Sequence, residues 1–209
     1  MELWLLVKGL IIGFSIAAPV GPIGVLCIRR TLTEGRLVGL LTGLGAASAD
    51  AVYGSIAGFG LTFIAAFLVS QQIWLSLVGG LFLLYLGLKT LRTAPADRAA
   101  LTSHESLLSA YASTFFLTLT NPATILSFAA IFAGVGLANS DGTYLSAVFL
   151  VMGVFAGSAL WWLLLSGGVS LLRARFTPPW LRWINRGSGF ILSGFGLLIL
   201  LNLVWPVLT

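Results

Sequence analysis

Asp50 is the only charged residue in the apolar run of residues 37–68, and no basic residue is expected at the same depth. An ionised carboxylate in such surroundings costs several kcal/mol unless it is paired or hydrated. Its carboxyl group is suited to exchanging a proton as water or substrate enters, or to holding the ammonium group of a substrate. The alternative is an Asp50 that stays protonated and donates to a neighbouring backbone carbonyl.

Two proline-containing segments interrupt other apolar runs of the chain. The first contains Pro19, Gly21 and Pro22, and the second contains Asn121 and Pro122 between threonines. Proline removes one helical hydrogen bond, and in lipid the freed carbonyl needs another partner. Corresponding interruptions in the two halves of a transporter indicate a binding site near the membrane midplane. The alternative for each segment is a packing kink without a ligand.

The candidate substrate-binding or coupling residues lie on these two segments and around Asp50. They are Pro19, Gly21, Pro22, Asp50, Tyr53, Thr120, Asn121, Pro122, Thr124, Ser158 and Trp161. Helix ends at such breaks carry partial charges that suit the carboxylate and ammonium groups of a zwitterion. Pro22 and Pro122 would hold the breaks open. Trp161 is the candidate for the protein interior, whereas Trp162 is expected to face lipid.

Catalytic and metal-binding constellations are missing from the sequence. Cys27 is the only cysteine and His104 the only histidine. A structural zinc site or a catalytic triad needs partners that the chain lacks. We therefore expect no enzyme, no cofactor and no bound metal, with Cys27 as a small apolar filler and His104 in a solvated loop.

The composition defines the elements that position these residues. Of 209 residues, 58% are hydrophobic and 8% are charged, and the mean hydropathy is +1.05. Soluble domains average about 45–50% apolar and about 25% charged residues. The sequence therefore predicts an all-α integral membrane protein and excludes a soluble enzyme, a nucleic-acid binder and a disordered chain. At about 20 residues per span, the chain has room for about six transmembrane helices.

Loop charge predicts the topology. The apolar runs cover residues 9–28, 37–68, 73–91, 106–140, 142–172 and 187–209, with a tight turn expected at Gln71 and Gln72. All basic residues except Lys8 lie in or beside the first, third and fifth connections. The positive-inside rule places these connections in the cytoplasm and both termini outside. The same basic surface suits anionic lipid headgroups, so the net charge of +5 needs no nucleic-acid partner.

Six spans divide into two halves of three, and an odd number per half orients the halves oppositely. We predict a 3+3 inverted-topology repeat within one membrane domain: residues 1–92, a cytoplasmic loop at 93–109, and residues 110–209. Glycine-rich stripes would allow close helix packing, either within the chain or in a homo-oligomer. The matched residues are Gly21-Pro22 with Asn121-Pro122, Asp50 with Ser158, and Gly80 and Gly87 with Gly189 and Gly196.

Residues 18–61, APVGPIGVLCIRRTLTEGRLVGLLTGLGAASADAVYGSIAGFGL, resemble the N-terminal signature of the lysine exporter (LysE/RhtB) family of translocators. The shared features are Gly21-Pro22, the basic stretch of residues 29–36, and the Gly/Ala-rich segment that contains Asp50. Residues 84–92, LYLGLKTLR, and Asn121-Pro122 are also similar to the family. One departure is Pro19-Val20 before Gly21-Pro22, where many members have a compact Pro-Gly-Pro.

The resemblance implies a secondary exporter of amino acids or related small zwitterionic solutes in a bacterial-type inner (plasma) membrane. Export would be coupled to protons and would use alternating access around the breaks in the first and fourth spans. Two alternatives remain open. A metal-ion exporter would need clustered oxygen or sulfur ligands in the membrane, and a non-transporting scaffold would tolerate Asp50→Asn except for effects on folding.

Overall fold

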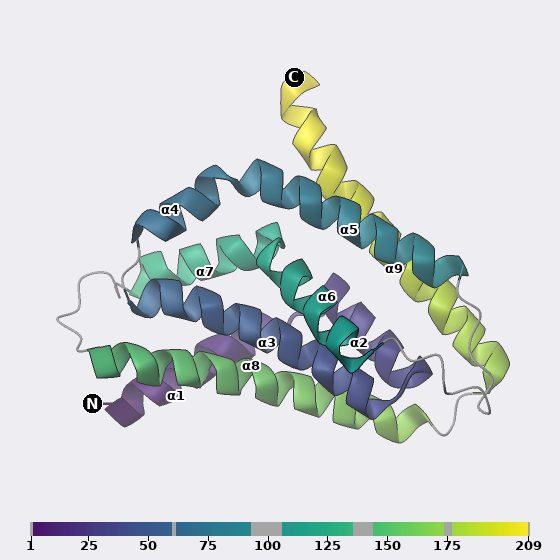
Figure 1. The fold of residues 1–209 in the computed structure, drawn as a ribbon, viewed down its shortest axis with the longest axis horizontal. Helices are drawn as coiled ribbons and strands as arrows, with labels where there is room; N and C mark the ends of the chain where they lie inside the picture. Colours follow the sequence, from purple (N-terminus) through teal and green to yellow (C-terminus); the bar gives the residue numbers. More distant parts are fainter. Residues whose placement is uncertain (1, 60–61, 93–105, 136–143, 174–176, 209) are drawn as a thin grey trace.

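The computed structural model describes residues 2–59, 62–92, 106–135, 144–173 and 177–208, and these residues are helical with no strand among them (Figure 1). The all-α class is therefore confirmed. His104 and most of the predicted 93–109 loop lie outside the described residues. The helices are α1 (Glu2–Ala17), α2 (Pro22–Thr33), α3 (Arg36–Gly58), α4 (Thr62–Ser70), α5 (Gln72–Arg92), α6 (Leu107–Leu119), α7 (Pro122–Val135), α8 (Tyr144–Leu172) and α9 (Pro178–Leu208).

Four of these helices, α3, α5, α8 and α9, are long and apolar enough to cross a membrane. Helices α1 and α2 together form a further candidate span, bent by 81° at the short break between them. Helix α6 is apolar but shorter. The chain is thus a multi-pass membrane protein, while the six-span count, the repeat and the outer placement of both termini stay predictions.

The turn expected at Gln71 and Gln72 is found as a single turn residue, Gln71, between the end of α4 at Ser70 and the start of α5 at Gln72. The N–H of Gln71 donates to the carbonyl of Phe67 at 2.9 Å, and the N–H of Leu75 donates to the carbonyl of Gln71 at 3.0 Å. These two bonds close the last turn of α4 and the first turn of α5. The apolar run of residues 37–68 is divided earlier, where α3 ends at Gly58.

Helix α3 lies at the centre of the bundle, between α8 and α6 (Figure 1). Helix α1 packs along α8, and α5 packs along α9. The α1–α8 contact is made by backbone against backbone: a Cβ atom added to Gly9 would overlap the carbonyl oxygen of Leu150, and one added to Gly157 would overlap that of Leu10. Small residues permit such an approach between helices in a membrane.

The α5–α9 contact is made by the glycines that the sequence matched between its two halves. A Cβ atom on Gly196 would lie 2.8 Å from the carbonyl oxygen of Gly80, and one on Gly189 would lie 3.0 Å from that of Gly87. Gly80 thus meets Gly196 and Gly87 meets Gly189, so the two helices run antiparallel here.

Replacing Gly157 by alanine is expected to destabilise the protein by about 1–3 kcal/mol, because the new methyl group would overpack a backbone contact. The matched control is Gly168→Ala on the same helix, where the added atom has no neighbour within 4 Å. Alanine improves helix propensity at both positions, so the control isolates the overpacking. Thermal unfolding in detergent measures the difference, and equal melting temperatures would contradict the close α1–α8 packing.

Candidate functional site

Both proline-containing segments are helix breaks in the structure. Helix α1 ends at Ala17 and α2 begins at Pro22, while α6 ends at Leu119 and α7 begins at Pro122. Proline suits the first position of a helix because its missing N–H would have no intrahelical partner there. Pro22 and Pro122 therefore each start a new helix directly after a break in the preceding one.

The helices that begin after the two breaks, α2 and α7, differ in how their first N–H groups are capped. The Oδ1 atom of Asn121 accepts from the N–H of Ala123 at 3.1 Å, at the start of α7. Gly21 precedes α2 and supplies no side-chain cap. The first N–H groups of a helix have no intrahelical partner and carry a partial positive charge. The start of α2 is therefore suited to a negatively charged group, whereas at α7 Asn121 also accepts from the N–H of Thr124 at 3.1 Å.

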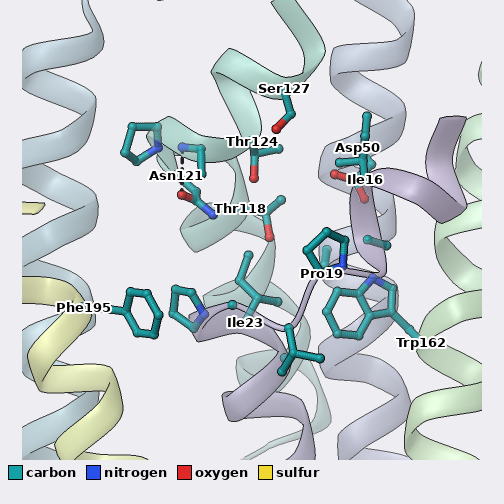
Figure 2. Close-up of a pocket in the computed structure, with 18 of the residues that line it drawn as sticks. Ile16, Pro19, Ile23, Asp50, Thr118, Asn121, Thr124, Ser127, Trp162 and Phe195 are labelled. Carbon is teal, nitrogen blue, oxygen red and sulfur yellow. Dashed lines mark hydrogen bonds between the residues drawn. The ribbon is translucent and has the colours of Figure 1, made fainter. Parts of the chain in front are cut away.

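A cavity of about 410 Å³ lies between the two breaks and is completed by α3, α8 and α9 (Figure 2). Small-molecule sites typically measure about 300–1,000 Å³. Among the residues that line it, Asp50 is the one charged side chain. Seven of the predicted site residues meet here: Pro19, Gly21, Pro22, Asp50, Asn121, Pro122 and Thr124.

The other four predicted site residues are not among the residues that line the cavity. The hydroxyl of Tyr53 donates to the carbonyl of Leu119 at 2.6 Å, at the end of α6. Thr120 donates to the carbonyl of Phe116 in its own helix at 2.9 Å. Trp161 packs edge-on against Phe14 of α1, with ring centroids 5.4 Å apart. Ser158 contacts Asp50 directly.

Asp50 is 3% exposed and ends a directional hydrogen-bond chain. The Nε1–H of Trp162 donates to the Oγ atom of Ser158 at 3.2 Å, and the Ser158 hydroxyl donates to Oδ2 of Asp50 at 2.6 Å. The indole N–H can only donate, so Ser158 accepts from Trp162 and keeps its own hydroxyl hydrogen for Asp50. Oδ2 of Asp50 is thus engaged by Ser158 in the structure, which makes Oδ1 the candidate oxygen for exchange of a proton or an ammonium group.

The expectation that Trp162 faces lipid is wrong, because its side chain is 4% exposed and lines the cavity. A Cβ atom on Gly43 of α3 would overlap the Trp162 side chain, so that glycine makes room for the indole. Trp162 follows Ser158 by one helical turn and shares its face, which was a usable sequence signal. Sequence reasoning also missed lining residues on α1, α7 and α9: Ile16, Ser127, Phe195 and Ile199.

Arg30 closes one end of the bundle. Its side chain is 1% exposed, and its guanidinium donates to Thr42 of α3 at 3.3 Å. It also donates to the Thr114 hydroxyl at 3.1 Å and to the Ala110 carbonyl at 3.2 Å, both on α6. This burial leaves no surface for a lipid headgroup, so the expected lipid contact is wrong for Arg30. Nearby, Arg173 of α8 donates to the carbonyl of Leu32 at 3.0 Å.

A buried apolar layer separates Arg30 from the cavity. On α2, Leu26 lies between Ile23 of the cavity and Arg30, and on α6 Leu117 lies beside the cavity residue Thr118. Leu83 and Leu192 belong to the same cluster. On α2, the cavity residue Ile23 is therefore followed toward the Arg30 end of the bundle by the buried Leu26 and then by the guanidinium.

Comparison with known proteins gives a consistent result over most of the chain. The model of the LysE type translocator family matches residues 14–203. The chain is 30% identical over 192 residues to the "Putative amino acid efflux protein YcgF" of Bacillus subtilis (strain 168), covering 90% of each protein. It is 31% identical over 157 residues to the "Uncharacterized membrane protein YahN" of Escherichia coli (strain K12), covering 71% of this chain and 67% of that protein. No solved structure matches the chain.

Proposed function

Because this chain belongs to the LysE type translocator family, we propose that it is a proton-coupled secondary exporter of amino acids or similar zwitterionic solutes. The observation that carries the proposal is the buried carboxyl group of Asp50 in a cavity that two helix starts also line. The substrate class follows from this pairing. The relative from Bacillus subtilis, named for amino acid efflux, supports the direction of transport.

The cavity offers one site for each charge of a zwitterion. The start of α2, which has no side-chain cap, presents backbone N–H groups to a substrate carboxylate, as helix N-termini commonly do for anions. Asp50 receives the ammonium group at Oδ1, while Ser158 keeps Oδ2 in place. Because the cavity is largely apolar, both interactions act in a medium that screens charge weakly.

Asp50 also provides a simple basis for coupling. A proton and a substrate ammonium group compete for the same carboxylate, so binding of one favours release of the other. In an exporter, a proton that enters from outside neutralises Asp50 and displaces the substrate outward. Loss of that proton to the cytoplasm restores the carboxylate for the next substrate.

The pattern of contacts supports alternating access around this site. Asp50 and Ser158 are matched positions of the predicted repeat, and they hydrogen-bond to each other. A residue that contacts its own counterpart lies on the two-fold axis that relates them. The glycine pairs of α5 and α9 follow the same rule, since Gly80 meets Gly196 and its counterpart Gly189 meets Gly87. These contacts support a proposed axis between Asp50 and Ser158, near which the midplane site of a repeat transporter is expected.

If the positive-inside rule holds, the Arg30 end of the bundle is cytoplasmic. The leucine layer and Arg30 then close the cavity toward the cytoplasm, which corresponds to one of the two end states of an exporter. The opposite end state requires the contacts of Arg30 with α3 and α6 to open.

Efflux from cells that accumulate single amino acids from dipeptides tests the proposal. Cells with the protein are expected to export at least one amino acid faster than cells with an empty vector, and collapse of the proton gradient is expected to remove the difference. If efflux persists without the gradient, the coupling is wrong but the export is right. If no amino acid leaves faster at verified membrane abundance, the proposed function is wrong.

A further inference from the structure

The cavity between the helix breaks has a polar part and an apolar part. Figure 2 shows Thr118, Thr124 and Ser127 grouped near the level of Asp50, with Ile23 and Phe195 below them. The polar side chains come from α6, α7 and the break between them, and the bulky apolar ones come from α2, α8 and α9. A zwitterionic headgroup held between Asp50 and the start of α2 therefore leaves the rest of a substrate against an apolar wall.

The apolar wall offers no free polar hydrogen to a substrate side chain. The Nε1–H of Trp162 donates to Ser158, so the indole presents its apolar ring surface to the cavity, and Ile23 and Phe195 have no polar side-chain atom. A hydroxyl or amide of a substrate side chain that packs against these three residues would therefore leave water without an equivalent partner among them.

A second substrate charge has no counterpart among the residues that line the cavity. None of them is Lys, Arg or His, and Asp50 is the one carboxylate. The substrate ammonium group uses Asp50, so the side chain of a basic amino acid would be buried without an opposite charge. An acidic side chain would meet the same apolar wall. Burial of an uncompensated charge disfavours binding strongly, which selects against both classes.

We propose that the substrate is a neutral amino acid with a large apolar side chain, of the leucine, methionine or phenylalanine kind, which packs against Ile23, Trp162 and Phe195. This inference rests on the proposed export function. It assigns Ile23 and Phe195 a role in selecting the side chain, separate from the binding of the headgroup by Asp50 and the start of α2.

The test uses the full chain reconstituted in liposomes under an imposed pH gradient, with labelled leucine, methionine, threonine, lysine and glutamate supplied one at a time. Leucine and methionine are expected to move about 10-fold faster than the other three, since apolar pockets discriminate by about 10–200-fold per methylene. Preferred transport of threonine, lysine or glutamate would overturn this inference and leave the export function standing. If sealed vesicles that contain the protein and hold the pH gradient transport none of the five amino acids, the export function itself is overturned.

Two variants test whether Phe195 and Ile23 of the cavity wall determine the preference for an apolar substrate side chain. Phe195→Ala is expected to reduce leucine transport about 10-fold or more, whereas Phe190→Ala on the same helix, at a residue that is 68% exposed, leaves it unchanged. Ile23→Thr keeps the branched shape and is expected to narrow the ratio of leucine to threonine transport. An unchanged ratio in Ile23→Thr would overturn the assignment even if Phe195→Ala failed to fold.

Discussion

Replacing Asp50 by asparagine is expected to reduce proton-driven efflux to the level of vesicles without the protein, with little change in membrane abundance. Asparagine keeps the size of the side chain, and its carbonyl oxygen can still accept the hydrogen bond from Ser158. The variant cannot bind a proton or pair with an ammonium charge. Efflux driven by an imposed pH gradient measures the loss.

Exchange of labelled for unlabelled substrate, without a gradient, separates the two roles of Asp50. Exchange that survives in Asp50→Asn identifies a proton carrier, and lost exchange identifies the partner of the ammonium group. Glu34→Gln is the matched control, because it makes the same carboxyl-to-amide change at an ion pair with Arg29 outside the cavity. Gradient-driven efflux of wild-type size in Asp50→Asn would contradict the role of Asp50 and leave export intact.

The second large effect is expected in stability. Arg30→Ala removes four hydrogen bonds of a buried guanidinium to Thr42, Ala110, Ser113 and Thr114, and it leaves a cavity. The loss is expected to be about 3–5 kcal/mol, the range of large-to-small changes at buried positions. This corresponds to a decrease of about 6–20 °C in melting temperature at about 2–4 °C per kcal/mol. Thermal unfolding in detergent measures it.

Two further arginine variants sharpen that test. Arg182→Ala removes an exposed guanidinium of α9, and such surface changes are usually within about 0.5 kcal/mol of neutral. Arg30→Lys keeps the charge but lacks the planar fork that reaches several acceptors at once, so its melting temperature is expected to lie between those of wild type and Arg30→Ala. Equal melting of Arg30→Ala and Arg182→Ala would contradict the closing role of Arg30.

The sequence predicted the features that depend on backbone chemistry and on isolated charge. Proline cannot continue a helix without loss of a hydrogen bond, so both breaks could be located from Pro22 and Pro122. A lone carboxyl group in an apolar run must face the protein interior, so Asp50 could be placed in the bundle. The small residues of α3 indicated close packing, and the structure shows it at Gly43 and Gly45.

The apolar wall of the cavity could not be predicted, because lipid tails are as apolar as a leucine side chain. Helix α8 is apolar around most of its circumference, so Ser158, one turn before Trp162, is the one local signal that distinguishes the inward Trp162 from its neighbour Trp161. Phe195 has the same ambiguity on α9. The burial of a basic residue could not be predicted either. Loop charge gives the orientation of the chain in the membrane. It does not show that Arg30 is buried, because its partners lie on α3 and α6 and no local sequence pattern connects them to it.

The glycine contacts of α1 bear on the order in which the molecule is made. Helix α1 leaves the ribosome well before α8, yet Gly9 and Gly13 find their partners only at Leu150 and Val154 of α8. Insertion of a helix into lipid and its packing against other helices are separate stages. The glycine face of α1 therefore stays without this partner until α8 has been made and inserted.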